Sequence, residues 1–560
     1  MTKPRRPSRT FTSRACALML LTLVLVLAQC GGQAQSAREQ KTGSPQSTRS
    51  SALAAGGRAP APTARTEKTR AADAEFARRV AKEIDEGEFA AARWGVLVVS
   101  LRDGRVLYQR DADRLFLPAS NLKLYTTAAA LDLLGADYRW RTSVYAAAPP
   151  DAQGTIGGDL TLYGRGAPDL AAHVTRHTPV DHVQQLADEL YRRGVRRVRG
   201  RVVGDESFLR GEALGDGWLW TDVQWYFGAE PSALSLDGNE ITVSLKPGAK
   251  VGDAAQVRLV PETDYVRVTN DAGTAERGVR PTLGVTRGLS DNEVRVWGDL
   301  PLGHPGYSVR LAVHRPALWA AQAFKRALAA REIKVDGEPV TRDARVRAAE
   351  RFEPARAVEL AAVVSDTLAE VVRVTNKESI NLNAELMLRT LGHERGQTYA
   401  PDEDQAKTQQ RGDDEAGTAV IRRWLNERAG ADTTRLALHD GSGLSRLDLV
   451  TPAATVKLLE RMARSPAAAA FNASLPTAGR DGTLAARLRG ARTAEHISAK
   501  TGTITYVHAL SGYATTAEGE PLAFAIICNE ETERAPATSA VDAIAALLAT
   551  YPDFPAAPNK

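Results

Sequence analysis

The sequence predicts a mixed α/β (α+β) fold, in which an antiparallel sheet is flanked by helices and a large, mostly β insert interrupts the chain. A hairpin pattern followed by an apolar helix stands near the start, and a β-β-α pattern stands at the end. Short β-like runs punctuated by Gly and Pro fill the middle. With 560 residues, the chain is long enough for about two to four domains.

The first thirty residues (1–30) have the pattern of an export signal. A basic stretch precedes the apolar run Ala15 to Ala28, which is shorter than the roughly 20 residues that span a membrane. The run ends in a sequence that resembles a lipoprotein cleavage box, in which a lipidated Cys30 would tether the protein to a membrane. Gln29 departs from that box, so cleavage nearby, for instance after Ser36, is the alternative. We expect an exported protein of the periplasm or cell envelope.

The positive charge of the chain lies in this leader and the segment that follows it. Met1 to Ala72 holds twelve Lys or Arg and two Asp or Glu, so Asp73 to Lys560 carries −5 although the whole chain carries +5. A mildly acidic folded part gives no basis for a nucleic-acid partner. Residues 31–74 almost lack large apolar side chains, which predicts a flexible linker.

The folded part begins near Glu75 with a helical pattern, and a strand, a hairpin turn at Asp103-Gly104 and a return strand follow. The expected elements up to Gly135 are strands at 94–101 and 106–108 and an apolar helix at 122–134. Short β-like runs then stand at 160–163, 202–204, 241–245, 257–260 and 294–296. They predict one or two inserted β-rich domains over 144–349, which leaves 75–143 and 350–557 as two parts of one domain.

The second of these parts begins with helical patterns and ends with strands. The expected helices are 360–372, 382–391, 418–426 and 451–463, and the β-β-α end comprises 496–500, 506–515, 521–528 and a helix at 537–550. No internal repeat of fixed period is present.

Ser120-Asn121-Leu122-Lys123 places a serine and a lysine three residues apart where a helix is expected to begin. Residues at this spacing share a helix face, so the amine of Lys123 would point toward the Ser120 hydroxyl. Serine is a weak nucleophile until a base takes its proton, and a partly desolvated lysine near other cations can be that base. The pattern is short enough to recur by chance, so by itself it identifies no catalytic serine.

Ser379-Ile380-Asn381 is a second short motif, and we expect it at a helix start. There a hydroxyl and an amide two residues apart can face one cleft, the hydroxyl relaying a proton and the amide holding a peptide carbonyl. A serine that only caps a helix is the structural alternative.

Lys500-Thr501-Gly502-Thr503 is the third motif, on an expected strand near two others. Gly502 has no Cβ and permits close approach of a ligand. Lys500 offers a positive charge for a carboxylate, and Thr501 and Thr503 offer hydroxyls. An edge-strand lysine followed by a turn is the structural alternative.

The three motifs occur in the order and context found in penicillin-binding proteins and serine β-lactamases. The gap of about 255 residues between Lys123 and Ser379 restricts this resemblance to those members that carry a large insert between the first two motifs. From about 75 to 555 the chain resembles the class C low-molecular-mass penicillin-binding proteins, which are D-alanyl-D-alanine carboxypeptidases and endopeptidases with a large insert. Further stretches that carry the resemblance are 162–168, 204–208, 440–445 and 474–484.

The resemblance implies a penicillin-binding/serine β-lactamase-like fold and an acyl-enzyme mechanism. Ser120 would attack the carbonyl between two D-Ala residues of a peptidoglycan stem peptide, with Lys123 as base and Asn381 holding the substrate. Water would then hydrolyse the acyl-enzyme. β-Lactams would mimic the substrate and leave the serine acylated. No metal or organic cofactor is implied.

The resemblance also assigns the leaving amine and the terminal carboxylate to particular groups. Ser379 and Lys500 would pass a proton to the amine. The oxyanion would lie between the backbone N–H groups of Ser120 and Thr503, and Thr501 together with Thr503 would bind the carboxylate.

The segment Trp218 to Ala229 resembles the part of the family's insert that lines the cleft. There Asp222 and Phe227 would bind the far, amine-bearing end of the stem peptide, although an aromatic cluster is more often part of a core. Three other features have simpler explanations. His173, His177 and His182 have a tempting spacing for a metal, but a proline interrupts any helix between the last two. Ser442 lacks the nucleophile-elbow pattern, and Cys528 is most simply a buried thiol.

Three other functions remain open at the level of sequence. A serine β-lactamase on the same fold would need a second carboxylate motif for deacylation, and none is found. A catalytically inert wall-binding protein would not need all the motif residues. The third is an exported esterase or amidase of broad specificity. Comparing the rates of hydrolysis of a D-Ala-D-Ala peptide and of an ester would distinguish it from a D-Ala-D-Ala peptidase.

Overall fold

The computed structural model describes residues 64–86, 88–168, 181–345, 352–399, 412–490, 494–531 and 537–554. Its central feature is a five-stranded antiparallel sheet with the strand order β17-β18-β19-β1-β2. The strands are β1 (Arg93–Ser100), β2 (Val106–Arg110), β17 (Ile497–Ile504), β18 (Val507–Thr515) and β19 (Pro521–Asn529). β17 is an edge strand of this sheet.

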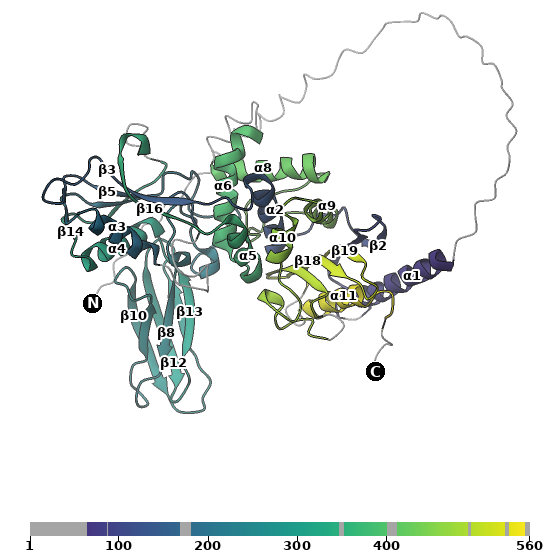
Figure 1. Ribbon diagram of the computed structural model, residues 1–560. Coiled ribbons are helices and arrows are strands. Elements are labelled where there is room, and N and C mark those ends of the chain that lie inside the picture. Colours follow the sequence, from purple (N-terminus) through teal and green to yellow (C-terminus); the bar gives the residue numbers. More distant parts are fainter. Residues whose placement is uncertain are drawn as a thin grey trace, which may run out of the picture. The chain divides into compact units, whose positions relative to one another are not determined.

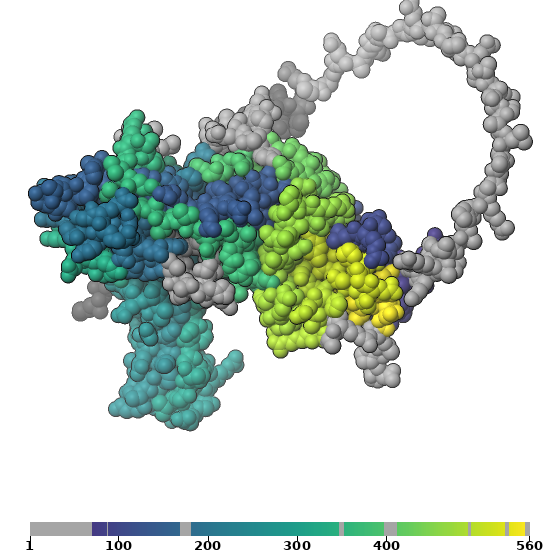
Figure 2. Space-filling view, viewed as in Figure 1, coloured from purple at the N-terminus to yellow at the C-terminus, as the bar shows by residue number. Residues whose placement is uncertain are grey.

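This sheet joins the two ends of the described chain. β1 pairs with β19 from Arg93 opposite Asn529 to Ser100 opposite Leu522. α1 (Ala64–Asp85) and α11 (Thr538–Thr550) lie against one face of this sheet (Figure 1). Apolar side chains of both helices are buried together with those of the strands. In Figure 2 the purple N-terminal atoms accordingly adjoin the yellow C-terminal ones. Strands buried on both faces explain why β1 and β19 read as continuous apolar runs rather than as alternating ones.

Helices cover the other face of the sheet and enclose α2 (Leu122–Leu134). Every residue from Leu122 to Leu131 is buried, including Lys123. The surrounding helices are α5 (Leu368–Glu378), α6 (Asn381–Tyr399), α8 (Asp413–Trp424), α9 (Pro452–Ala463) and α10 (Ala468–Ser474). A π-helical turn, Leu425–Ala429, continues α8. Within the described residues, none of the helices combines the length and hydropathy that crossing a bilayer requires.

The inserted region contains β-sheets and two longer helices. Its larger sheet has the order β15-β7-β5-β3-β16. These strands are β3 (Arg141–Ala146), β5 (Leu160–Tyr163), β7 (Val202–Asp205), β15 (Val340–Arg342) and β16 (Val358–Val364). The helices α3 (His182–Arg192) and α4 (Pro316–Ala330) pack on it. The boundaries 144 and 350 stay predictions: β3 runs across position 144, whereas its antiparallel partner β16 begins after position 350.

Smaller sheets complete this region, and all have three strands. One consists of β4 (Thr155–Ile156), β6 (Arg197–Val198) and β14 (Lys334–Val335). The second consists of β8 (Glu240–Lys246), β9 (Gln256–Val260) and β13 (Tyr307–Ala312). The third consists of β10 (Arg267–Ala275), β11 (Gly284–Arg287) and β12 (Glu293–Pro301).

Several local expectations need correction. The helix expected at 360–372 is the strand β16 followed by α5, because Val358–Val364 pairs with β3 and tertiary pairing overrides a short apolar pattern. α1 begins at Ala64, within the expected linker, since Ala, Arg, Glu and Lys form helices without an apolar face. The region expected to be mostly β consists largely of strands among its described residues, and α3 and α4 cover its larger sheet. The expected helix 122–134 is confirmed by α2.

Candidate active site

Ser120 lies in a single 3-10 turn, Ala119–Asn121, that leads into α2. The residue before it, Ala119, is buried and has a φ of 47°, a left-handed conformation that costs energy for a residue with a Cβ. This turn leaves Ser120 half-buried at the start of a buried helix. One helical turn further, Lys123 donates to its hydroxyl, with a distance of 2.9 Å between Nζ and Oγ.

Lys123 is held by groups from three parts of the chain. Besides Ser120, its Nζ donates to Oδ1 of Asn381 at 2.6 Å and to the backbone carbonyl of Ser442 at 2.8 Å. Burial lowers the pKa of Lys123 to about 8, although the nearby carboxylates of Asp440 and Glu385 act in the opposite direction. A lysine with this pKa can release its proton near neutral pH, as a general base for serine must.

The second motif stands between two helices rather than at the start of one. Ser379 is the C-cap residue of α5 and adopts a left-handed conformation with a φ of 59°, so only the last residue of the motif, Asn381, stands at the expected helix start. α6 begins two residues later with Asn381. This sharp change of direction lets Ser379 face Lys500 while Asn381 faces Lys123.

The third motif lies on the edge strand β17. Lys500 is fully buried and donates to Oγ of Ser379 at 2.9 Å and to the backbone carbonyl of Thr501 at 2.9 Å. Burial lowers its pKa well below the usual value, and the charge of Lys123 lowers it further. Thr501 is buried and contacts the Thr483 hydroxyl at 2.8 Å, whereas Thr503 is exposed.

Gly502 has a packing role that the sequence did not reveal. A Cβ at this position would lie 2.7 Å from the carbonyl oxygen of Pro118 and 3.2 Å from the amide nitrogen of Asn121. The glycine therefore lets β17 pack directly against the turn that carries Ser120. Close approach was expected at Gly502, but toward a ligand; here the close neighbour is the protein's own backbone.

These contacts form two hydrogen-bonded groups, one with Lys123, Ser120 and Asn381 and the other with Lys500 and Ser379, and the effect of the Lys123 charge on Lys500 places the two groups close together. One lysine contacts each serine: Lys123 contacts Ser120, and Lys500 contacts Ser379. Two amines with lowered pKa beside two hydroxyls can remove a proton from one hydroxyl and deliver a proton through the other. Such a site suits acyl transfer, in which a nucleophile must lose a proton and a leaving amine must gain one.

The family model for the D-Ala-D-Ala carboxypeptidase 3 (S13) family matches residues 76–551. The chain belongs to this family. It is therefore a serine-type D-Ala-D-Ala carboxypeptidase-family hydrolase of the penicillin-binding type, and the resemblance inferred from the sequence is confirmed.

Known relatives of this S13 protein resemble it over most of their length. A D-alanyl-D-alanine carboxypeptidase of Actinomadura sp. (strain R39) is 36% identical over 475 residues, which cover 82% of this chain and 81% of the relative. D-alanyl-D-alanine carboxypeptidase DacB of Haemophilus influenzae is 25% identical over 456 residues, which cover 79% of this chain and 88% of the relative. The crystal structure of penicillin-binding protein 4 (dacB) from Haemophilus influenzae matches at 22% identity with a TM-score of 0.71, covering 85% and 99% of the two chains. This match confirms the predicted fold class.

The structure places Phe227 directly beside the motifs of this S13 protein and Asp222 a short distance along the same segment. The backbone carbonyl of Phe227 accepts from Nδ2 of Asn381 at 2.8 Å. Asp222 is partly buried, which raises its pKa, and the charge of Arg446 opposes that shift. Arg446 in turn donates to the carbonyl of Thr505, just after β17.

Sequence reasoning missed several residues that support the motifs. The backbone of Ser442, set aside as a nucleophile, supplies an acceptor for Lys123. Lys377 donates to Oδ1 of Asp481 at 2.7 Å and to the carbonyl of Leu475 at 2.6 Å, which connects the Ser379 segment to the loop before Thr483. The sequence held one signal for these residues. Ser442 and Asp481 lie in the stretches 440–445 and 474–484, whose glycines indicate tightly packed loops.

The cysteine and the three histidines that the sequence analysis set aside show no sign of a catalytic or metal-binding role within the described residues. Cys528 is fully buried in β19, and burial raises the pKa of its thiol to about 12. His173 and His177 lie outside the described residues, and His182 begins α3. Among the described residues, no group of three or more His, Cys, Asp or Glu side chains is arranged to hold a metal.

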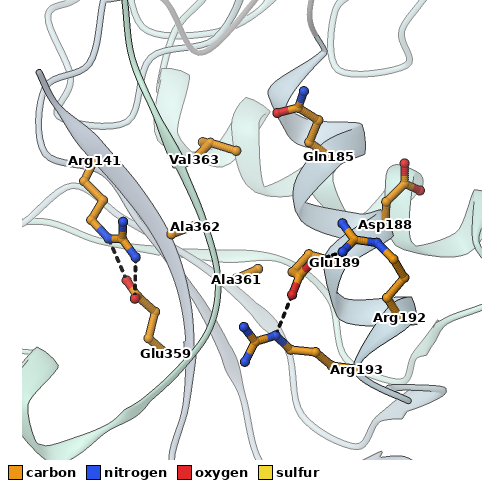
Figure 3. A pocket seen from close by; sticks show the side chains of 10 residues that line it. All are labelled: Arg141, Gln185, Asp188, Glu189, Arg192, Arg193, Glu359, Ala361, Ala362 and Val363. Carbon is orange, nitrogen blue, oxygen red and sulfur yellow. Dashed lines mark hydrogen bonds and ion pairs between the residues drawn. The ribbon is translucent and has the colours of Figure 1, made fainter.

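A cavity of about 410 Å³ lies away from these motifs, between β16 and α3 (Figure 3). Figure 3 shows Arg141 paired with Glu359 on the sheet, and Arg193 paired with Glu189 on the helix. Its charged residues are balanced in sign, and none of its lining residues belongs to the three motifs. We therefore place the active site at the motifs and not at this cavity.

Proposed function

We propose that this S13 protein trims peptidoglycan stem peptides through an acyl-enzyme on Ser120. The contact that carries the proposal is the hydrogen bond of 2.9 Å between Lys123 Nζ and Ser120 Oγ, made by a buried lysine whose pKa is lowered to about 8. Lys123 takes the serine proton as the hydroxyl attacks the carbonyl between two D-Ala residues. The C–N bond then breaks and the terminal D-Ala leaves.

Ser379 and Lys500 deliver the proton that the leaving amine requires. Lys500 donates to Ser379 at 2.9 Å, so a proton passed from the Ser379 hydroxyl can be replaced from the lysine. Asn381 holds the peptide, and Thr501 with Thr503 binds the terminal carboxylate. The backbone N–H groups of Ser120 and Thr503 stabilise the oxyanion. Water finally hydrolyses the ester on Ser120 and regenerates the hydroxyl.

The far end of the stem peptide is assigned to the segment that contains Asp222 and Phe227. The Asn381–Phe227 contact supports this assignment because it ties the segment to a motif residue. Asp222 offers a carboxylate to the amine of the peptide. We assign both carboxypeptidase and endopeptidase cleavage to the site, since the same acyl-enzyme serves either.

The protein is proposed to act after export, in the periplasm or cell envelope, where peptidoglycan is found. The basic and apolar pattern of residues 1–30 supports export, and lipidation of Cys30 would tether the protein to the membrane. The mass of the mature N-terminus tests this point. A mature protein that begins with a diacylglycerol-modified Cys30 supports the membrane tether. A mature protein that begins with an unmodified residue after Cys30 overturns the tether but leaves the proposed export standing.

Intact-protein mass spectrometry after incubation with benzylpenicillin tests the catalytic proposal. A solved relative, penicillin-binding protein 4 of Haemophilus influenzae, has been crystallised as a β-lactam complex, which makes this probe appropriate. We expect one stable adduct on the wild type and none on Ser120→Ala. Rapid consumption of penicillin without an adduct would instead indicate a β-lactamase, and neither adduct nor consumption would indicate an inert wall-binding protein.

A further inference from the structure

Asp440 is a buried carboxylate that accepts hydrogen bonds from five donors. Its Oδ1 accepts from the backbone N–H groups of Ser442 at 3.1 Å and Gly443 at 2.7 Å. Its Oδ2 accepts from the Ser445 N–H at 2.8 Å, the Ser442 hydroxyl at 3.2 Å and Nε1 of Trp218 at 2.9 Å. Only 2% of the residue is exposed. Asp440 therefore determines the shape of the loop 440–445.

This loop supplies the carbonyl of Ser442 that Lys123 contacts at 2.8 Å. The loop is also packed without spare room between two elements of the active site. A Cβ on Gly441 would lie 2.6 Å from the carbonyl oxygen of Ala384, and one on Gly443 would lie 1.9 Å from that of Ala119. A change in the loop therefore changes the position of the acceptor for Lys123.

Trp218 connects the loop to a segment of the insert, residues 215–228, which we call the docking segment. Its indole provides one of the five donors to Asp440. Two more contacts join the docking segment to the same loop region: Arg446 N–H to the Gly217 carbonyl at 3.2 Å, and His439 Nδ1 to Asp216 at 2.8 Å. The docking segment also contains Asp222 and Phe227, the residues assigned to the substrate.

The charges around Lys123 give Asp440 an electrostatic effect as well. The charged and titratable groups near Lys123 and its carboxylates are Lys500, Glu385, Asp440, Asp448 and Arg389. Burial raises the pKa of Glu385 to about 8, and it raises that of Asp448 well above the usual value. In both cases the charge of Asp440 adds to the increase. Glu385 and Asp448 thus favour their protonated forms.

We propose that Asp440 is a positioning residue for Lys123, which holds the Ser442 carbonyl on the lysine and, through Trp218, links that contact to the docking segment. The proposal rests on the proposed function, in which Lys123 is the base for Ser120. Substrate seated on the docking segment then acts on the same loop that orients the catalytic lysine. The residue itself touches no reacting atom.

The first test is the pH dependence of Ser120 acylation by benzylpenicillin in Asp440→Asn. The substitution keeps the size of the side chain but removes the negative charge that stabilises protonated Lys123. We expect the rising limb of the pH profile to move to lower pH, by about one unit. Asp448→Asn is the matched control, because Asp448 already favours its neutral form and its substitution removes no charge. The rising limb of the pH profile of this variant should coincide with that of the wild type.

The second test is Trp218→Phe, which removes the indole donor and leaves the charge of Asp440 in place. We expect acylation to slow by about three- to tenfold at every pH, because one charge-assisted hydrogen bond to the loop is lost, with no movement of the limb. Circular dichroism and thermal melting establish that each variant is folded. If Asp440→Asn does not fold, Trp218→Phe decides the question.

The outcomes separate this proposal from the proposed function. An unmodified wild type after penicillin treatment refutes the function. A wild type that is acylated, with a folded Asp440→Asn variant whose limb has not moved, refutes the positioning role. Wild-type acylation rates in Trp218→Phe refute the link to the docking segment. A rising limb in Asp448→Asn that moves as far as the one in Asp440→Asn refutes the positioning role of Asp440, because the shift is then not specific to that carboxylate.

Discussion

Replacing Gly443 by alanine places a methyl group against the turn that carries Ser120. Gly443 has a φ of 81°, and a Cβ built there lies 1.9 Å from the carbonyl oxygen of Ala119. A Cβ atom essentially never lies within 3.0 Å of a heavy atom of a neighbouring segment, so one of the two backbones has to move by about 1 Å. Neither can move alone, because Asp440 holds the loop and Ala119 is buried.

The size of the effect follows from two separate costs. A left-handed φ costs a non-glycine residue about 1 kcal/mol, and the backbone displacement adds about 1–3 kcal/mol as an overpacked contact does. A misplacement of about 1 Å near the chemistry lowers the rate by about 100-fold. We therefore expect Gly443→Ala to lose about 2–4 kcal/mol of unfolding free energy and about 100-fold in acylation rate.

Gly430→Ala provides a matched control for this prediction. Gly430 also has a left-handed φ, 65°, but no atom lies within 4 Å of the position of its Cβ. Its alanine variant should lose about 1 kcal/mol and acylate at the wild-type rate. Urea unfolding and the rate of benzylpenicillin adduct formation measure both effects. Acylation of Gly443→Ala within threefold of Gly430→Ala would refute the reasoning, because the clash would then have no consequence at the serine.

Two further predictions concern protonation and the support of the second motif. Because Lys123 has a pKa of about 8 and must be neutral to act as base, acylation should rise about tenfold per pH unit below that value and level off above it; a flat profile between about pH 6 and 8 would exclude this role. Asp481→Asn leaves the buried amine of Lys377 without its counter-ion, so we expect a loss of about 1–3 kcal/mol in unfolding free energy and slower acylation. Glu353→Gln, which breaks an exposed ion pair, should change neither quantity measurably, and equal effects in the two variants would contradict the prediction.

Local patterns in the sequence predicted the elements that carry two of the motifs. The apolar run from Leu122 to Leu134 is followed by Gly135, and α2 has the same bounds. The terminal β-β-α pattern corresponds to β17, β18, β19 and α11. These elements are long, strongly apolar and bounded by turn residues, so their own sequence suffices to define them.

Patterns failed where partners distant in the sequence determine the conformation. The run 360–372 was expected to be a helix, but its first residues belong to the strand β16, which pairs with β3 more than two hundred residues earlier in the chain. Ser379 was expected at a helix start, but it ends α5 in a left-handed conformation, and α6 begins only at Asn381. Nothing in the neighbouring residues indicates either arrangement.

The sequence by itself determined the family, the order of the motifs and the residue types to which we assign the chemistry. Only the tertiary structure showed that the carbonyl of Ser442, 319 residues from Lys123, accepts a hydrogen bond from the lysine, and that Trp218 donates to Asp440 in the same loop. The physical reason is that side-chain identity is local, whereas burial, desolvation and the pKa of Lys123 depend on every segment packed around it.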